Sequence, residues 1–220
     1  LLASELFGAD IEKIKPVIVE GGSDSASLDN FFELLVLSGR SIAHAMMMLI
    51  PAAWEHENLM NRELANFYKY HACFMEPWDG PAAVAFTDGE NVAAALDRNG
   101  LRPARYIITN NDICVMASEV GVLDIAPEDI KISGRIEPGK IFFIDTKNGR
   151  LVDDANIKRE ISGRNPYGLW LSDNMVDLEG LQSISTPANY KPEDLIPMLK
   201  SFGYTREDLK VIIRPMADDG

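Results

Sequence analysis

Residues 21–29 read Gly21-Gly22-Ser23-Asp24-Ser25-Ala26-Ser27-Leu28-Asp29, and this stretch separates a short apolar run from a helix. Its two glycines and its small polar residues predict a loop. The helix is predicted by an apolar stripe with helical spacing, formed by Leu28, Phe31, Phe32, Leu35 and Val36. We expect this helix to end at Gly39, and residues 16–19 before the loop to form a short strand.

Asp24 therefore lies at or just before the N-terminus of a helix. The free N–H groups of the first turn and the helix dipole favour an ionised carboxylate at this place. Such a fixed anion could hold the ammonium group of a ligand. The alternative is that Asp24, Ser25 or Ser27 caps the helix, and local sequence alone favours the cap because Ser and Asp are common N-cap residues.

The composition is typical of a globular protein. The chain has 220 residues, of which 46% are hydrophobic and 25% charged, enough for one large domain or one domain with an appendage. The net charge of −13 argues against nucleic acid and anionic membranes as partners, because both require a basic face. No apolar run approaches the length of a bilayer span.

The cysteines and histidines show no metal-binding pattern. Cys73 and Cys114 lack metal-type spacing, and His44, His56 and His71 are scattered. We predict no metal site and a reducing, cytoplasmic compartment. Each cysteine is expected to be a small buried apolar residue, and His44 a packed or surface histidine.

Two more helices and a series of strands follow. The second helix is expected to begin after Ser41 and to end before Pro51, and the third to span about residues 57–73. Short apolar runs joined by Asp-Gly, Asn-Gly and Asn-Asn turns then predict antiparallel hairpins. Because these runs are nearly continuous, we expect their sheet to be buried on both faces, by helices and by a second sheet. The predicted strands are 82–87, 91–96, 105–109, 113–117, 140–145 and 150–152.

The remaining segments are helices and a linker. Residues 154–163 are predicted to form a helix, 164–190 a linker and 191–202 another helix. A final helix is expected after Thr205, which would cap it with Asp208 three residues on. Residues 1–7 are expected to end a helix stopped by Gly8. We also expect the chain to be cut from a longer protein at both ends.

Three stretches, in this order, closely resemble the large-subunit family of glutamate synthases. They are Gly-Gly-Ser-Asp-Ser-Ala-Ser-Leu-Asp-Asn at 21–30, Glu-Pro-Trp-Asp-Gly-Pro-Ala-Ala at 76–83, and Leu-Asp-Arg-Asn-Gly-Leu-Arg-Pro-Ala-Arg-Tyr at 96–106. The resemblance covers essentially the whole chain. The third stretch also resembles the phosphoribosyl amidotransferases, which share the same kind of glutaminase domain.

The resemblance implies an α+β fold of the N-terminal-nucleophile type. This fold is a four-layer αββα sandwich, expected here in part, with a helical linker at the C-terminus. Residues 1–174 would form the C-terminal part of a class II glutamine amidotransferase domain. Residues 175–220 would form a linker and the start of a central domain.

The resemblance also implies the chemistry. The domain hydrolyses L-glutamine to glutamate and ammonia, and the ammonia moves to a flavin domain for reductive transfer to 2-oxoglutarate. The cysteine nucleophile and the oxyanion pair would lie upstream of Leu1, so no catalytic residue is expected in this chain. Asp24 would bind the α-ammonium of glutamine, with Gly22 and Ser23 shaping the same pocket wall.

A second group of candidates is Asn99, Gly100 and Arg102. Asn99-Gly100 predicts a type I′ hairpin turn, which would account for both residues. Arg102 could brace that turn, which we favour, or face the pocket or an inter-domain surface. Trp78 and Asp79 are expected to form a rigid structural turn.

The remaining expectations concern partners and alternatives. No cofactor is expected in this chain, whereas the parent enzyme would carry FMN and an iron–sulfur cluster. The implied partners are L-glutamine, the other domains of the same polypeptide, and a small electron-transfer subunit or ferredoxin, in the cytoplasm or a plastid stroma. Two alternatives remain, a phosphoribosyl-type glutamine amidotransferase and a non-catalytic glutamine-binding module. The helical tail after residue 190 and the turn at 76–81 argue against the first.

Overall fold

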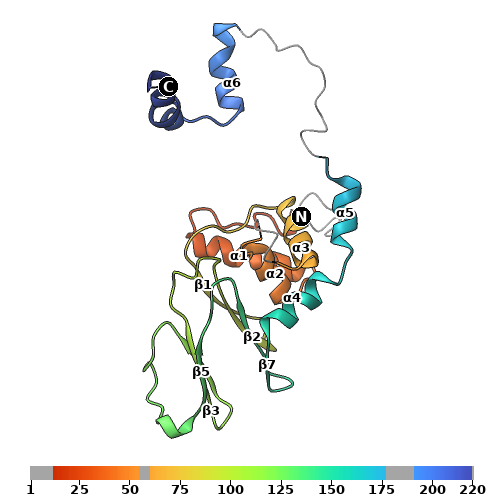
Figure 1. Ribbon diagram of the computed structural model, residues 1–220, viewed down its shortest axis with the longest axis vertical. Helices are drawn as coiled ribbons and strands as arrows, with labels where there is room; N and C mark the ends of the chain where they lie inside the picture. The colour runs from red at the N-terminus through yellow and green to blue at the C-terminus, as the bar shows by residue number, and fades with distance from the viewer. Residues whose placement is uncertain (1–11, 55–59, 177–190, 220) are drawn as a thin grey trace. The chain divides into compact units, whose positions relative to one another are not determined.

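The computed structural model describes residues 12–54, 60–176 and 191–219. The chain divides into two units, Leu1–Met175 and Val176–Gly220. The first unit holds all the strands of the described residues, with helices before and after them (Figure 1). Its elements are α1 (Asp24–Leu37), α2 (Ile42–Leu49), α3 (Arg62–Ala72), β1 (Ala83–Thr87), β2 (Asn91–Leu96), β3 (Arg105–Thr109), β4 (Cys114–Ala117), the 3₁₀ turn η3 (Pro127–Asp129), β5 (Ile130–Arg135), β6 (Ile141–Asp145), β7 (Arg150–Val152), α4 (Asp154–Ser162) and α5 (Tyr167–Asn174).

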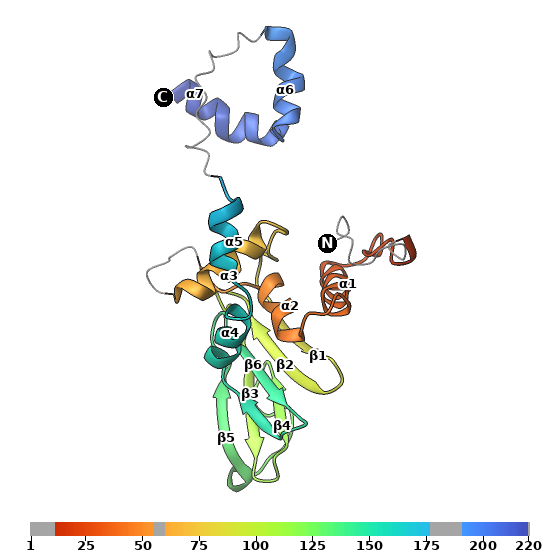
Figure 2. The ribbon, with the colours of Figure 1, turned by 90° about the vertical axis from the view of Figure 1, so that its right-hand side faces the viewer.

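The strands form two antiparallel sheets. One has the order β1-β2-β6-β7 and the other the order β4-β3-β5 (Figure 2). The expected antiparallel strands are confirmed, but the first four do not form one continuous meander. Strand β5 was not predicted, because Gly134 interrupts its pattern and glycine is unfavourable in strands. Glycine leaves room for Tyr106, since a Cβ at Gly134 would lie 2.6 Å from Cζ and the hydroxyl oxygen of Tyr106.

Strand β2 is covered on both faces, as its continuous apolar run predicts. Ala93 and Ala95 belong to the core that β2 shares with α1, α2 and α4. Ala94 and Leu96, which point the opposite way, pack with Phe142 of β6 and with residues of the second sheet. The ring centroids of Tyr106 on β3 and Phe142 are 4.4 Å apart. Helices, first sheet and second sheet therefore form three successive layers.

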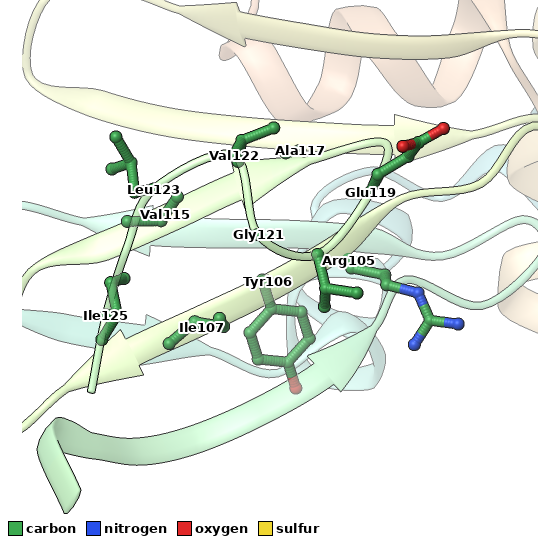
Figure 3. A pocket seen from close by; sticks show the side chains of 11 residues that line it. Arg105, Tyr106, Ile107, Val115, Ala117, Glu119, Gly121, Val122, Leu123 and Ile125 are labelled. Atoms are coloured by element: carbon green, nitrogen blue, oxygen red, sulfur yellow. The ribbon is translucent and has the colours of Figure 1, made fainter. Parts of the chain in front are cut away.

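The second sheet is buried on only one face, contrary to the prediction for its strands. Tyr106 and Cys114 face the first sheet. The opposite face is crossed by the loop 119–125, whose Val120, Val122 and Leu123 remain exposed (Figure 3). Double-sided burial in the described residues is thus a property of the two central strands of the first sheet, β2 and β6.

Three predictions of secondary structure need correction: a strand, the start of a helix and a linker. Residues 16–19 form no strand, and α3 begins at Arg62, with residues 60 and 61 outside the helix. The expected linker at 164–190 contains helix α5, which packs on α3 by contacts of Tyr70 with Tyr167 and Trp170. The predictions for residues 1–8 lie outside the described residues, as do 57–59 of the third helix and 177–190 of the linker.

The second unit contains only helical elements among its described residues. These are the 3₁₀ turn η5 (Pro192–Asp194), α6 (Leu195–Ser201), the π-helical segment η6 (Asp208–Ile213) and α7 (Arg214–Asp219). The predicted cap at Thr205 is confirmed. The hydroxyl of Thr205 accepts a hydrogen bond from the Asp208 N–H at 3.1 Å, and the Asp208 carboxylate accepts from the Thr205 N–H at 2.8 Å.

Asp97, at the end of β2, holds together the start of β1 and the two turns through which the chain passes between the sheets. Its carboxylate is buried and accepts hydrogen bonds from the N–H groups of Ala82 at 3.0 Å, Asn99 at 2.9 Å and Gly100 at 3.1 Å. Its backbone carbonyl accepts from the N–H of Gly139 at 2.9 Å, in the turn before β6. One residue thus fixes the start of β1, the crossing between the sheets and the entry to β6.

The 97–100 turn is not the predicted type I′ hairpin turn. Strands β2 and β3 belong to different sheets, so Asn99-Gly100 lies in the connection between the two sheets and not in a hairpin. A type I′ turn requires positive φ at both central residues, whereas Gly100 has φ +59° and Asn99 is not in that region. Asp97 stabilises the turn through an Asx-type side-chain contact.

Two histidines connect α2 and α3, the half-buried His44 and the buried His71. His44 Nε2 and His71 Nε2 are 3.2 Å apart, and His71 Nδ1 lies 2.8 Å from the carbonyl oxygen of Phe67. Because a carbonyl only accepts, His71 Nδ1 carries the proton, His71 Nε2 accepts and His44 Nε2 donates. Burial is the main cause that lowers the pKa of His44 to about 3 and that of His71 to about 4, and Arg40 lowers both further. This confirms His44 as a packed histidine.

We predict that stability falls on acidification below about pH 6.5. Unfolded histidine takes up a proton near that pH while His71 in the fold stays neutral, so the unfolded state gains protons first. The free energy of unfolding should decrease by on the order of 2 kcal/mol from this residue between pH 7 and pH 5. Urea unfolding across this range measures it. His71→Gln should reduce this pH dependence without removing it, because His44 also stays neutral in the fold. An equal slope of unfolding free energy against pH in both proteins would contradict the assignment.

We predict that Asp97→Ala destabilises the first unit by on the order of 3 kcal/mol, because it leaves several N–H groups without their acceptor. The matched control is Asp88→Ala, which removes an exposed carboxylate that also accepts from two backbone N–H groups, those of Glu90 and Asn91. The control should cost about 1 kcal/mol. Equal losses in chemical denaturation would show that Asp97 has no special role.

Candidate functional site

The glycine–serine loop leads directly into α1. Ser23 is the N-cap, and its hydroxyl oxygen accepts a hydrogen bond from the N–H of Ala26 at 3.2 Å. The hydroxyl of Ser25 lies 3.0 Å from that of Ser23. The cap is therefore Ser23, and not Asp24, Ser25 or Ser27 as the sequence suggested. The predicted helix end is confirmed, with Gly39 at φ +92° just after the helix.

This assignment leaves the Asp24 carboxylate available. Asp24 is the first residue of α1 and is exposed. Its side chain makes no hydrogen bond or ion pair with any residue that the structure describes. The N-terminal dipole of α1 stabilises a negative charge here. The arrangement is suited to binding a ligand cation such as an ammonium group.

The loop before Asp24 is held in place by backbone contacts. Gly21 has φ +76°, a conformation that favours glycine. The N–H of Gly22 donates to the Val19 carbonyl at 3.1 Å, and the N–H of Val19 donates to Asn30 Oδ1 at 3.2 Å. The second contact ties the loop to the body of α1, so that Gly22, Ser23 and Asp24 keep a defined position at its end.

The second group of candidates lines two different cavities. Asn99 borders a cavity of about 220 Å³ that also includes Trp78 and Asp79. Gly100 and Arg102 border another of about 380 Å³. The guanidinium of Arg102 makes no hydrogen bond to the 97–100 turn in the described part of the chain, and the bracing expected of it is supplied by Asp97. Gly22, Ser23 and Asp24 lie outside both cavities.

Trp78 and Asp79 serve the structure, as expected. The N–H of Trp78 donates to the Leu49 carbonyl at 2.7 Å, which fixes the turn to the end of α2. Asp79 forms an exposed ion pair with Arg98 at 3.4 Å.

Neither cysteine has the surroundings of an activated nucleophile. Cys73 is exposed at the C-terminal end of α3, contrary to the prediction that it is buried, and its thiol donates to the Lys69 carbonyl at 3.4 Å. Cys114 is half-buried between the sheets, and burial raises the pKa of its thiol. A catalytic cysteine needs a lowered pKa or an adjacent base.

Within residues 12–54, 60–176 and 191–219, no group of three or more His, Cys, Asp or Glu side chains is placed to hold a metal ion. The helices in the same ranges are too short or too polar to cross a membrane.

Sequence reasoning missed two polar features of this unit. Asp97 carries an available signal, because Asp followed by Asn-Gly is a common side-chain-stabilised turn. The His44–His71 contact joins residues on separate helices, and no spacing rule predicts it. Arg105 and Arg135 were also not singled out, and they line the same cavity as Arg102.

Comparison with known proteins identifies the family. The model of the class-II glutamine amidotransferases matches residues 1–170. The chain is 44% identical over 220 residues to the glutamate synthase [NADPH] large chain of Bacillus subtilis, covering 99% of this chain and 14% of that protein. It is 42% identical to the glutamate synthase [NADH] of Schizosaccharomyces pombe, and this match covers 100% of this chain and 11% of that protein. It is 40% identical to the chloroplastic ferredoxin-dependent glutamate synthase 2 of Arabidopsis thaliana, and this match covers 100% of this chain and 14% of that protein.

The chain thus spans about a seventh or less of the length of these relatives. The family match, in contrast, extends over most of the chain and includes every strand of the described residues. It also includes the loop that presents Asp24. The chain belongs to the class-II glutamine amidotransferases.

Proposed function

We propose that this chain is the glutamine-binding second part of the glutaminase domain of a glutamate synthase. The observation that carries the proposal is the unpaired Asp24 carboxylate at the N-terminus of α1, in a loop whose sequence resembles that family. The similarity to glutamate synthases with three different named electron donors supports it. The same similarity favours a glutamate synthase over a phosphoribosyl amidotransferase.

In the proposed reaction, water and L-glutamine give glutamate and ammonia. Asp24 pairs with the α-ammonium of glutamine and orients it, while Ser23 and Gly22 shape the adjacent wall. The rest of the polypeptide supplies the cysteine nucleophile, its α-amino group as base, and two N–H donors for the oxyanion. The cysteine thiolate attacks the side-chain carbonyl of glutamine, ammonia leaves, and a thioester between the cysteine and the glutamyl group remains. Water then hydrolyses this thioester to glutamate and the free cysteine.

The complete domain is proposed to be a four-layer αββα sandwich. Three layers are present in the described residues, and the outer face of the second sheet carries exposed apolar side chains beside Ile107 and Val115. A further helical layer on this face would bury them. Residues 175–220 are proposed to lead from the glutaminase domain into a central domain.

The remaining chemistry belongs to the proposed parent enzyme. Ammonia would pass to a flavin domain carrying FMN and an iron–sulfur cluster, where it is transferred reductively to 2-oxoglutarate. The electrons would come from a nicotinamide through a small subunit, or from ferredoxin. We propose a cytoplasmic enzyme, or a stromal one if the source is a plant.

We predict that Asp24→Ala in the intact enzyme weakens glutamine use by on the order of 2–5 kcal/mol, because the α-ammonium loses its charged partner. Activity with free ammonia should be retained, since Asp24 would act only in glutamine binding. Steady-state kinetics with either nitrogen source measure both effects. The matched control is Asp29→Ala, an exposed aspartate on the same helix. Unchanged glutamine dependence in Asp24→Ala would refute the assignment.

We also predict that the 220-residue chain by itself releases no ammonia from glutamine. Its cysteines lack an activating base, and the proposed nucleophile lies elsewhere in the polypeptide. A coupled ammonia assay on the purified chain tests this. Glutaminase activity that is abolished by a thiol-blocking reagent would place the nucleophile at Cys73 or Cys114 instead.

A further inference from the structure

The cavity beside Arg102 lies at the end of β2 and at the adjoining ends of β3 and β5. It has a volume of about 380 Å³ and is lined by the segment 100–105 and by Arg135, Ile136 and Pro138. Gly100 lies directly against Pro138, since a Cβ at Gly100 would be 2.5 Å from that ring. The N–H of Ile136 donates to the Ala104 carbonyl at 2.9 Å. The cavity wall is therefore fixed by backbone contacts.

Three arginines line this cavity. Two of them are cross-strand neighbours on the face of the second sheet opposite to Tyr106. Arg105 on β3 is directly opposite Arg135 on β5 in the register of the second sheet. Like charges in such a position destabilise a sheet. Arg102 follows the same wall, three residues before Arg105. Arginine clusters of this kind are the usual means of holding phosphate or carboxylate groups.

The described residues form no ion pair or hydrogen bond with these guanidinium groups. Glu137 is the nearest carboxylate in sequence to Arg135 and interacts with it electrostatically, but its ion pair is with Lys140 at 2.6 Å. Figure 3 shows the carboxylate of Glu119 and the guanidinium of Arg105 pointing away from each other.

This lack of partners is notable because acidic residues are in excess. The chain has 34 Asp and Glu against 21 Lys and Arg. A concentration of unpaired positive charge on such a chain favours an external anion as the missing partner.

We propose that Arg102, Arg105 and Arg135 form a binding site for a small dianion, a phosphate ester or a dicarboxylate. The planar guanidinium groups of Arg105 and Arg135 would each bind two oxygens, and the anion would remove their mutual repulsion. Arg102 would close the third side. The site is separate from Asp24, which binds a cation in the proposed function, and it does not depend on that proposal.

The test is local hydrogen exchange in the intact protein, with peptides covering residues 100–109 and 130–138. The probes are inorganic phosphate and succinate, each compared with sodium chloride at the same ionic strength. We expect at least one probe to slow exchange in both peptides several-fold. Arg105→Gln and Arg135→Gln should each weaken this effect at least tenfold in anion concentration, whereas the control Arg150→Gln, on the other sheet, should not.

A second comparison separates anion binding from a purely structural role. In chloride alone, Arg135→Gln should slow exchange in β3 and β5, because it removes the repulsion with Arg105. Protection by phosphate but not succinate would assign the site to phosphate esters, and the converse to dicarboxylates. No protection by either probe, or equal protection in wild type and Arg135→Gln, would overturn the proposal.

Discussion

The buried carboxylate of Asp97 is the contact on which the architecture of the first unit depends. It accepts three backbone N–H groups, and its own carbonyl accepts that of Gly139. The carbonyl of Gly139 in turn accepts from Lys158 at 2.7 Å, and Lys158 pairs with Asp154 at the start of α4. Asp154 also accepts from the N–H of Ile141 at 2.8 Å. These polar contacts join the first sheet and the two turns between the sheets to helix α4. Buried networks of this kind specify a structure only when every member is satisfied.

The division of tasks at α1 has a direct consequence for function. Because the hydroxyl of Ser23 accepts the hydrogen bond at the N-cap, the neighbouring carboxylate of Asp24 is not needed as the capping group. The same helix packs Leu28 and Leu35 in the core, so its N-terminus is held by the most buried part of the unit. A charged group on a rigid element, exposed and without a partner in the described residues, is the kind of feature that binding sites need. Helix, cap and carboxylate together explain why this loop is suited to an ammonium ligand.

The sequence predicts those parts of the fold that depend on local periodicity. The apolar stripe of α1, the start of α2 after Ser41 and the burial of β2 on both faces were predicted from local patterns and are confirmed. It does not predict which strands share a sheet, because the crossing at 97–104 resembles a hairpin turn until pairing is known. Strand β5 was missed because Gly134 interrupts its pattern. The cross-strand partner of Gly134 is Tyr106, which is distant in sequence. The candidate Asp24 came from a family resemblance, whereas its availability depends on the Ser23 cap, which only the structure reveals.

The most direct test of the central claim is a crystal structure of the intact polypeptide with L-glutamate, the product, bound in the glutaminase domain. The account predicts that the α-ammonium of the product lies about 2.7–2.9 Å from a carboxylate oxygen of Asp24, at the N-terminus of α1. The account would be contradicted if the α-ammonium of the bound glutamate were held by another carboxylate and Asp24 were exposed to solvent.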